Sequence, residues 1–144
     1  MLSGVVLLVS VPLLVQGVKA AQAPAVCENL TSLSLPYTTI TAADHIAAGQ
    51  FRLPGGNSAA FADLPAFCRV AATVKPTPSS DIKMEAWLPA NGWNGTFEGR
   101  GSSGIGGAVP YNDLATSLRS GYATAGSDTG HQGDSSYALT EPEK

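Results

Sequence analysis

The stretch IKMEAWL, residues 82–88, gives one of the clearest structural signals in the sequence, because two kinds of side chain alternate along it. Isoleucine, methionine, alanine and leucine fall on one face, and lysine, glutamate and tryptophan fall on the other. Such period-two alternation is typical of a β-strand. Pro89 and the Asn91-Gly92 pair follow at once and mark the end of the element. The stretch therefore predicts a strand over residues 82–88.

Two further strands are predicted on either side of this one. Residues 67–74 are rich in β-branched and apolar side chains, and a loop of proline, threonine and serine at residues 76–80 joins them to residues 82–88. Residues 96–98 form a third, shorter candidate strand. A glycine-rich run, residues 99–107, follows it directly.

The hydrophobic period changes after the glycine-rich run. Apolar residues at positions 114, 115 and 118 have helical spacing, and Asn112 or Asp113 is suited to cap the start of a helix. Gly121 stands where a glycine commonly ends a helix. Residues 122–126 then predict another strand. Earlier in the chain, residues 42–48 favour one or two helical turns after Thr41.

The order of these elements predicts an α/β protein. It begins with two strands joined by a hairpin-like turn and ends with a strand–helix–strand unit whose crossover should be right-handed. A sheet of about four strands with one helix leaves one face bare, whereas parallel strands normally have both faces covered. We therefore expect the chain to be the N-terminal portion of a larger α/β domain with an incomplete sheet.

Composition excludes several classes of protein. The chain has 144 residues, 13% of them charged, and a formal net charge of −3. Its eight Lys and Arg residues form no basic stripe, which argues against a nucleic-acid partner.

Residues 1–20 resemble a signal peptide: the apolar run is short for a membrane span of about 20 residues, and Val18-Lys19-Ala20 fits a cleavage site. A signal anchor is the alternative. Residues 21–144 would then form the secreted part.

A secreted chain can hold its cysteines as a disulfide. Cys27 and Cys68 are the two cysteines, and a bridge between them would stabilise the fold by roughly 3–4 kcal/mol. Two unrelated thiols are the alternative. The triplets beginning at Asn29 and Asn94 match the N-glycosylation pattern. No cluster of Cys and His has the spacing of metal ligands, so we expect no metal site in this chain.

The glycine-rich run has several interpretations. Gly99, Gly101 and Gly104 match the dinucleotide pattern G-x-G-x-x-G, although the predicted helix starts well after the motif. No Gly-Lys-[Ser/Thr] ending is present, as a phosphate-binding loop would need. A third interpretation is an oxyanion hole, since α/β-hydrolases take one donor from the loop between the third strand and the first helix. A flexible turn is the simplest alternative.

No nucleophile accompanies this loop, because the sequence contains no G-x-S-x-G. The stretch AGSDTGHQGD, residues 125–134, contains the Asp-Thr-Gly of aspartic proteases, but a second carboxylate would be needed and the flanking residues are not hydrophobic. We favour a structural role, in which Asp128 accepts backbone N–H groups and Gly130 adopts positive φ. His131 is a weaker candidate for a catalytic base, because the histidine of such triads comes last in the chain.

Taken together, these motifs resemble the tannase and feruloyl esterase family of secreted α/β-hydrolases. The resemblance extends over residues 27–144. The matching pieces, in order, are Cys27 with Leu30, LPAFCRV at 64–70, EAWLP at 85–89, WNG at 93–95, the glycine-rich run, GYAT at 121–124 and DTGH at 128–131.

The resemblance implies a serine esterase with a large lid domain. In the family the nucleophile lies in a Cys-Ser-x-Gly-Gly segment, followed by Asp and His, and a calcium ion binds in the lid. None of these segments is present here, so no catalytic triad residue is assigned, and the nucleophile is expected beyond Lys144. The resemblance also implies that Cys27 and Cys68 pair with each other.

One oxyanion donor carries over by resemblance, as a backbone N–H at Ser103 or Gly104. The family loop usually reads Gly-Asn-Gly-Gly, whereas this chain has Gly101-Ser102-Ser103-Gly104. We expect a secreted carboxylic ester hydrolase acting on small or plant cell-wall esters of phenolic acids such as ferulate or gallate. The 144-residue chain alone should be inactive. The alternative is a secreted protein without catalytic activity that binds a ligand or partner.

Overall fold

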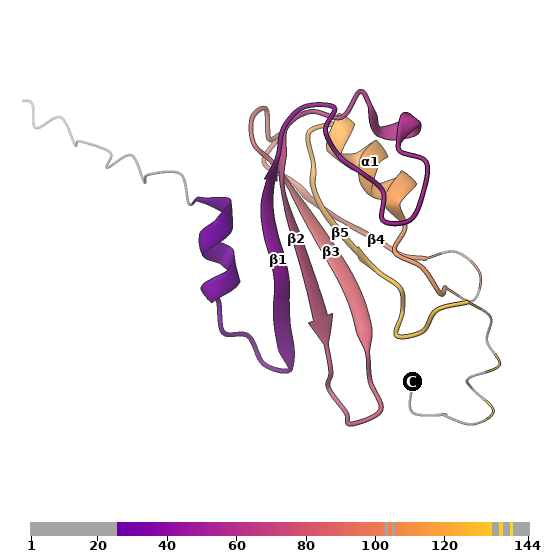
Figure 1. Ribbon diagram of the computed structural model, residues 1–144. Coiled ribbons are helices and arrows are strands. Elements are labelled where there is room, and N and C mark those ends of the chain that lie inside the picture. The colour runs from indigo at the N-terminus through magenta and orange to yellow at the C-terminus, as the bar shows by residue number, and fades with distance from the viewer. Residues whose placement is uncertain (1–25, 103, 105, 134–135, 137–138, 140–144) are drawn as a thin grey trace, which may run out of the picture.

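A computed structural model describes residues 26–102, 104, 106–133, 136 and 139. They form a mixed five-stranded sheet in the order β1-β2-β3-β5-β4, with α1 against one face (Figure 1). The strands are β1 (Thr38–Ile46), β2 (Phe67–Val74), β3 (Ile82–Pro89), β4 (Phe97–Arg100) and β5 (Ala123–Ser127). The helices are α1 (Tyr111–Arg119) and the short 3₁₀ segments η1 (Cys27–Ser32) and η2 (Ala59–Phe61). The predicted signal peptide, residues 1–20, lies outside the described residues.

The central hairpin matches the sequence prediction. β2 and β3 pair antiparallel along their whole length, from Phe67 opposite Pro89 to Val74 opposite Ile82. The strand–helix–strand unit is also confirmed, because β4 and β5 pair in parallel and α1 connects them. The sheet has one strand more than the approximate number that the sequence predicts, and that strand is β1.

The helical turns predicted for residues 42–48 are wrong. These residues belong largely to β1, which pairs antiparallel with β2 from Thr38 opposite Val74 to Ile46 opposite Phe67. Alanine favours helix only weakly when tertiary pairing offers an alternative. Here a run of β-branched residues starts the strand, and the ladder with β2 carries it through the alanines.

The start of α1 also differs from the prediction. The helix begins at Tyr111 after Pro110, and no side chain caps it, so neither Asn112 nor Asp113 has the expected role. Proline is suited to this boundary because it has no N–H group to satisfy. The end of the helix agrees with the prediction: Gly121 has a φ of +79°, and a Cβ there would lie 2.8 Å from the Gly92 carbonyl oxygen.

The core lies on the sheet face that α1 covers. The face of β3 that carries Glu85 and Trp87 is the buried one, whereas the aliphatic face is only half-buried. Aromatic and leucine side chains from β2, β3, α1 and residues 51–64 pack together there: Phe51, Phe61, Leu64, Phe67, Trp87, Leu114 and Leu118. The expectation of one poorly covered sheet face therefore agrees with the structure.

A disulfide ties the N-terminal segment to the sheet. Cys27 in η1 and Cys68 in β2 are bonded, with their Cα atoms 5.6 Å apart, which confirms the predicted pair. Both ends of the bridge lie near β1, and η1 packs beside that strand (Figure 1). Within the described ranges, no helix is both long and apolar enough to cross a membrane.

Candidate functional site

The parallel pairing of β4 and β5 brings two loops together at one edge of the sheet. Arg100 lies opposite Gly126, so the glycine-rich loop (residues 101–110) and the Asp128 turn (residues 128–133) leave the sheet side by side. The Gly107 N–H donates to the Asp128 carbonyl oxygen at 3.1 Å. Crevices beyond the carboxyl ends of strands are where open α/β sheets bind ligands.

The Asp128 turn is built around a buried carboxylate. Asp128 is 2% exposed, and its Oδ1 accepts the backbone N–H groups of Lys83 and Gly130, both at 2.9 Å. Gly130 has a φ of +92°. These contacts confirm the structural role predicted for the Asp-Thr-Gly tripeptide, because the carboxylate is engaged by the backbone of its own turn and of β3.

His131 lies behind the glycine-rich loop. Its side chain is buried, and its Nδ1 is 3.4 Å from the Thr129 hydroxyl. A Cβ added at Gly107 would lie 3.2 Å from Nε2, so the ring packs directly against the loop backbone. These two contacts place the ring between its own turn and the glycine-rich loop, which is a supporting position.

Of the two predicted oxyanion donors, the structure describes Gly104. Ser103 lies outside the described residues. Gly104 is exposed and has a φ of +64°, a conformation that glycine adopts without strain. The helix begins at Tyr111, seven residues after Gly104, so the dinucleotide interpretation loses the helix N-terminus that it needs beside the third glycine.

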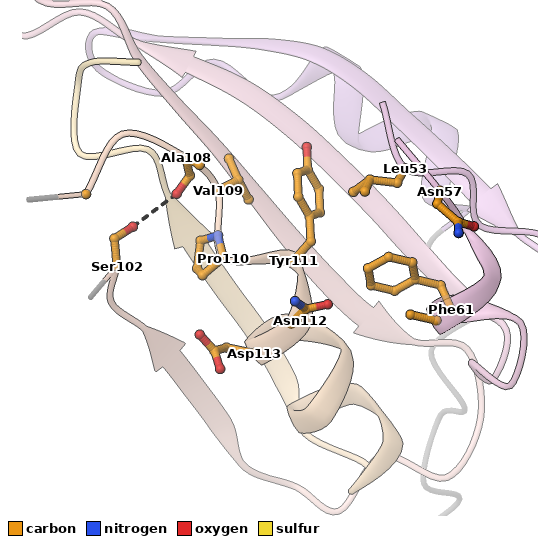
Figure 2. Close-up of a pocket in the computed structure, with 12 residues that line it drawn as sticks. Leu53, Asn57, Phe61, Ser102, Ala108, Val109, Pro110, Tyr111, Asn112 and Asp113 are labelled. Atoms are coloured by element: carbon orange, nitrogen blue, oxygen red, sulfur yellow. Dashed lines mark hydrogen bonds between the residues drawn. The ribbon is translucent and has the colours of Figure 1, made fainter. Parts of the chain in front are cut away.

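An open cavity of about 580 Å³ adjoins this loop (Figure 2). The loop and the start of α1 form one wall, and residues 53–61 form the other. Its polar side chains come from Asn57, Ser102, Asn112 and Asp113. The cavity combines apolar surface with a few hydrogen-bonding groups, which suits a small neutral ligand better than a strongly anionic one.

A buried ionic network lies beneath the cavity. The Glu85 carboxylate accepts from the Arg69 guanidinium, from Tyr111 Oη at 2.9 Å and from Trp87 Nε1 at 2.8 Å. Burial and the Glu85 charge raise the pKa of Tyr111 to about 12, and the hydrogen bond to Glu85 raises the pKa of Arg69. The network joins β2, β3 and the first residue of α1, and so fixes where the helix starts.

Sequence reasoning missed this network and the role of Ser102. The alternation predicts Glu85 on the less apolar face of β3, and in the structure that face is the core. A usable signal was present: a glutamate two residues before a tryptophan in a strand, with an arginine in the neighbouring strand. In the sequence, Ser102 is only a departure from the family loop, whereas in the structure its hydroxyl contacts two carbonyl oxygens.

The candidate glycosylation sites are both exposed, and their modification stays a prediction. Asn94 is also part of a turn: its Oδ1 accepts from Thr96 N–H, and its Nδ2 donates to the Ser120 carbonyl oxygen. Asn29 lies in η1.

The calcium ion implied by the resemblance is expected in a lid outside this chain. Among the described residues, no group of three or more His, Cys, Asp or Glu could hold a metal ion.

Comparison with known proteins finds proteins named as esterases that are similar to this chain. It is 42% identical over 127 residues to an uncharacterised esterase of Xanthomonas campestris pv. campestris, covering 86% of this chain and 22% of that protein. It is also 42% identical over 80 residues to a probable feruloyl esterase B-1 of Aspergillus oryzae, covering 56% of this chain and 15% of that protein.

Structural and family-level comparisons agree. The crystal structure of feruloyl esterase B from Aspergillus oryzae superimposes with a TM-score of 0.65 and 33% identity, over 74% of this chain and 22% of that one. The chain thus spans about a fifth of the length of these relatives. Residues 68–144 match the family model described as tannase and feruloyl esterase. The chain belongs to the tannase and feruloyl esterase family and forms an N-terminal portion of its fold.

Proposed function

We propose that this chain is the N-terminal part of a secreted enzyme that hydrolyses carboxylic esters of aromatic acids such as ferulate or gallate. One observation carries the proposal: the glycine-rich loop and the Asp128 turn meet at the shared carboxyl edge of β4 and β5. Family membership and the esterases among the relatives support the reaction class.

The chemistry needs a serine that this chain does not supply in a nucleophile motif. That serine would attack the ester carbonyl carbon, and a histidine would take its proton and then return one to the leaving alcohol. The negative charge that develops on the carbonyl oxygen would be met by a backbone N–H at Ser103 or Gly104. Losing one such donor typically costs about 3–4 kcal/mol of transition-state stabilisation.

The cavity beside the loop offers a place for part of the substrate. Tyr111 and Phe61 give it aromatic surface, and Asn57 and Asn112 give it hydrogen-bonding groups (Figure 2). A phenolic ester has the same combination of an aromatic ring and neutral polar groups. We place no catalytic step through calcium, because the described residues offer no ligand set for it.

Secretion and glycosylation belong to the same proposal. The Cys27–Cys68 disulfide fits an oxidising compartment, and the exposed Asn29 and Asn94 sequons fit passage through a glycosylating one. The test of function is hydrolysis of methyl ferulate and methyl gallate by the complete protein, with methyl butyrate as a comparison substrate. Higher kcat/KM for the aromatic esters supports the proposal. If the complete protein binds these compounds without turnover, it is a binding protein and not an esterase.

A further inference from the structure

We propose that the Ser102 hydroxyl is a positioning residue that holds the glycine-rich loop in the conformation needed to present the oxyanion donor. This inference rests on the proposed esterase function. Ser102 touches neither the substrate carbonyl nor a triad residue in this account. It acts through the loop backbone.

The geometry around Ser102 carries the proposal. Its Oγ lies 3.1 Å from the Ala108 carbonyl oxygen and 3.0 Å from the Ser127 carbonyl oxygen, and its one hydrogen is shared between these two acceptors (Figure 2 shows the first contact). Ala108 is near the end of the loop, and Ser127 is the last residue of β5. One side chain therefore links the two ends of the loop to each other and to the edge of the sheet.

The loop depends on such links because its own backbone is permissive. Gly104, Gly106 and Gly107 all have positive φ, and glycine has more conformational freedom to lose on folding than any other residue. Ser102 and the Gly107 N–H hold the loop at its base, on either side of the tip. Thr129 also packs against the base, because a Cβ on Gly106 would collide with its hydroxyl.

The position of the donor sets the size of the expected effect. Catalytic geometry tolerates errors of about half an ångström, and a misplacement of about 1 Å can lower the rate about 100-fold. Removing the Ser102 hydroxyl leaves the loop base held on one side only. We expect Ser102→Ala to lower kcat about 10- to 100-fold and to change KM less than about 3-fold. Although Ser102 also lines the cavity, we expect substrate binding to depend on the other polar groups there, because the Ser102 hydroxyl is engaged by the two carbonyl oxygens.

The experiment uses the complete protein that contains this chain, with methyl ferulate as substrate. Ser102→Ala is compared with Ser102→Thr, which keeps a hydroxyl, and with Ser32→Ala, which removes an exposed hydroxyl bonded to the Asn29 carbonyl oxygen in η1. Hydrogen exchange of peptides covering residues 104–108 is measured on all three variants. The expected result is a fall in kcat and faster loop exchange for Ser102→Ala alone, with Ser102→Thr within about 3-fold of wild type.

The outcomes separate this inference from the proposed function. If wild type is active and Ser102→Ala keeps kcat within 2-fold, the inference is overturned and the esterase function stands. A Ser102→Ala variant that raises KM at unchanged kcat also overturns it, because binding would then be affected and not the transition state. If wild type hydrolyses no ester, the proposed function fails, and hydrogen exchange of the loop is then the test of the inference. Faster exchange in Ser102→Ala supports the positioning role of Ser102, and unchanged exchange overturns it.

Discussion

Replacing Glu85 by glutamine should be among the most destabilising conservative changes in this chain. The Glu85 side chain is 4% exposed, and its two oxygens accept four hydrogen bonds, two of them from Arg69. Glutamine has one accepting oxygen, and its amide nitrogen only donates. The Tyr111 hydroxyl can rotate to accept from that nitrogen, but the guanidinium cannot. The partly buried Arg69 guanidinium therefore loses its counter-charge and one acceptor.

The magnitude follows from these losses. Removing one partner of a buried ion pair costs about 3–5 kcal/mol. Glutamine retains two of the four accepting contacts, and the Arg69 side chain is 20% exposed to water, so we expect a value near the lower end, about 3 kcal/mol. With a urea m-value of about 1–3 kcal/mol/M, the unfolding midpoint should fall by roughly 1–3 M.

Urea unfolding followed by tryptophan fluorescence measures this directly, because Trp87 is buried and donates to Glu85. Asp63→Asn is the matched control: Asp63 makes the same two-bond pairing with Arg119, but at the surface, and should leave stability near that of wild type. A double-mutant cycle with Arg69→Met should give a coupling energy of about 1.5 kcal/mol or more. A cost below about 1 kcal/mol for Glu85→Gln, or additive single changes, would mean that the Glu85 carboxylate is not needed to compensate the Arg69 charge.

Three further outcomes are expected. The pKa of Tyr111 is raised to about 12 in the folded chain, so the stability that its protonated form contributes is present below pH 10 and is lost as the pH rises toward 12. A titration followed by tyrosinate absorbance should show one tyrosine ionising late, and Tyr111→Phe should remove that late step. Gly106→Ala should push the loop off Thr129 and speed exchange of the loop amides, and normal exchange would contradict the close approach. Replacing both Cys27 and Cys68 by serine should lower the free energy of unfolding by about 4 kcal/mol in a denaturant titration, whereas an unchanged midpoint would mean that the bridge constrains little.

Local sequence patterns are sufficient to predict the hairpin of β2 and β3 at the centre of the fold. The alternation over residues 82–88 and the β-branched run at 67–74 each predicted a strand, and a short loop between them left only a hairpin. Gly121 is predictable as the end of the helix because its positive φ is a local requirement. The Asp128 turn was also predictable, since aspartate and glycine at that spacing favour a tight turn.

The sequence predictions fail where the structure depends on residues that are distant in the sequence. Alanines in β1 favour helix locally, but the ladder with β2 outweighs that preference. Which face of β3 is buried depends on where α1 and residues 51–64 pack, and alternation alone cannot tell the two faces apart. Ser102 illustrates the same limit at the site, because its partners Ala108 and Ser127 meet only after β4 and β5 have paired.

The proposed function assigns the oxyanion loop of an esterase to this chain and the nucleophile to another part of the polypeptide. The most direct test compares two preparations at equal concentration on methyl ferulate: the complete protein, and residues 21–144 alone. We expect steady turnover by the complete protein, none by residues 21–144, and covalent labelling by a fluorophosphonate at a serine outside this chain. Comparable turnover by residues 21–144, or labelling of a serine within them, would contradict the account.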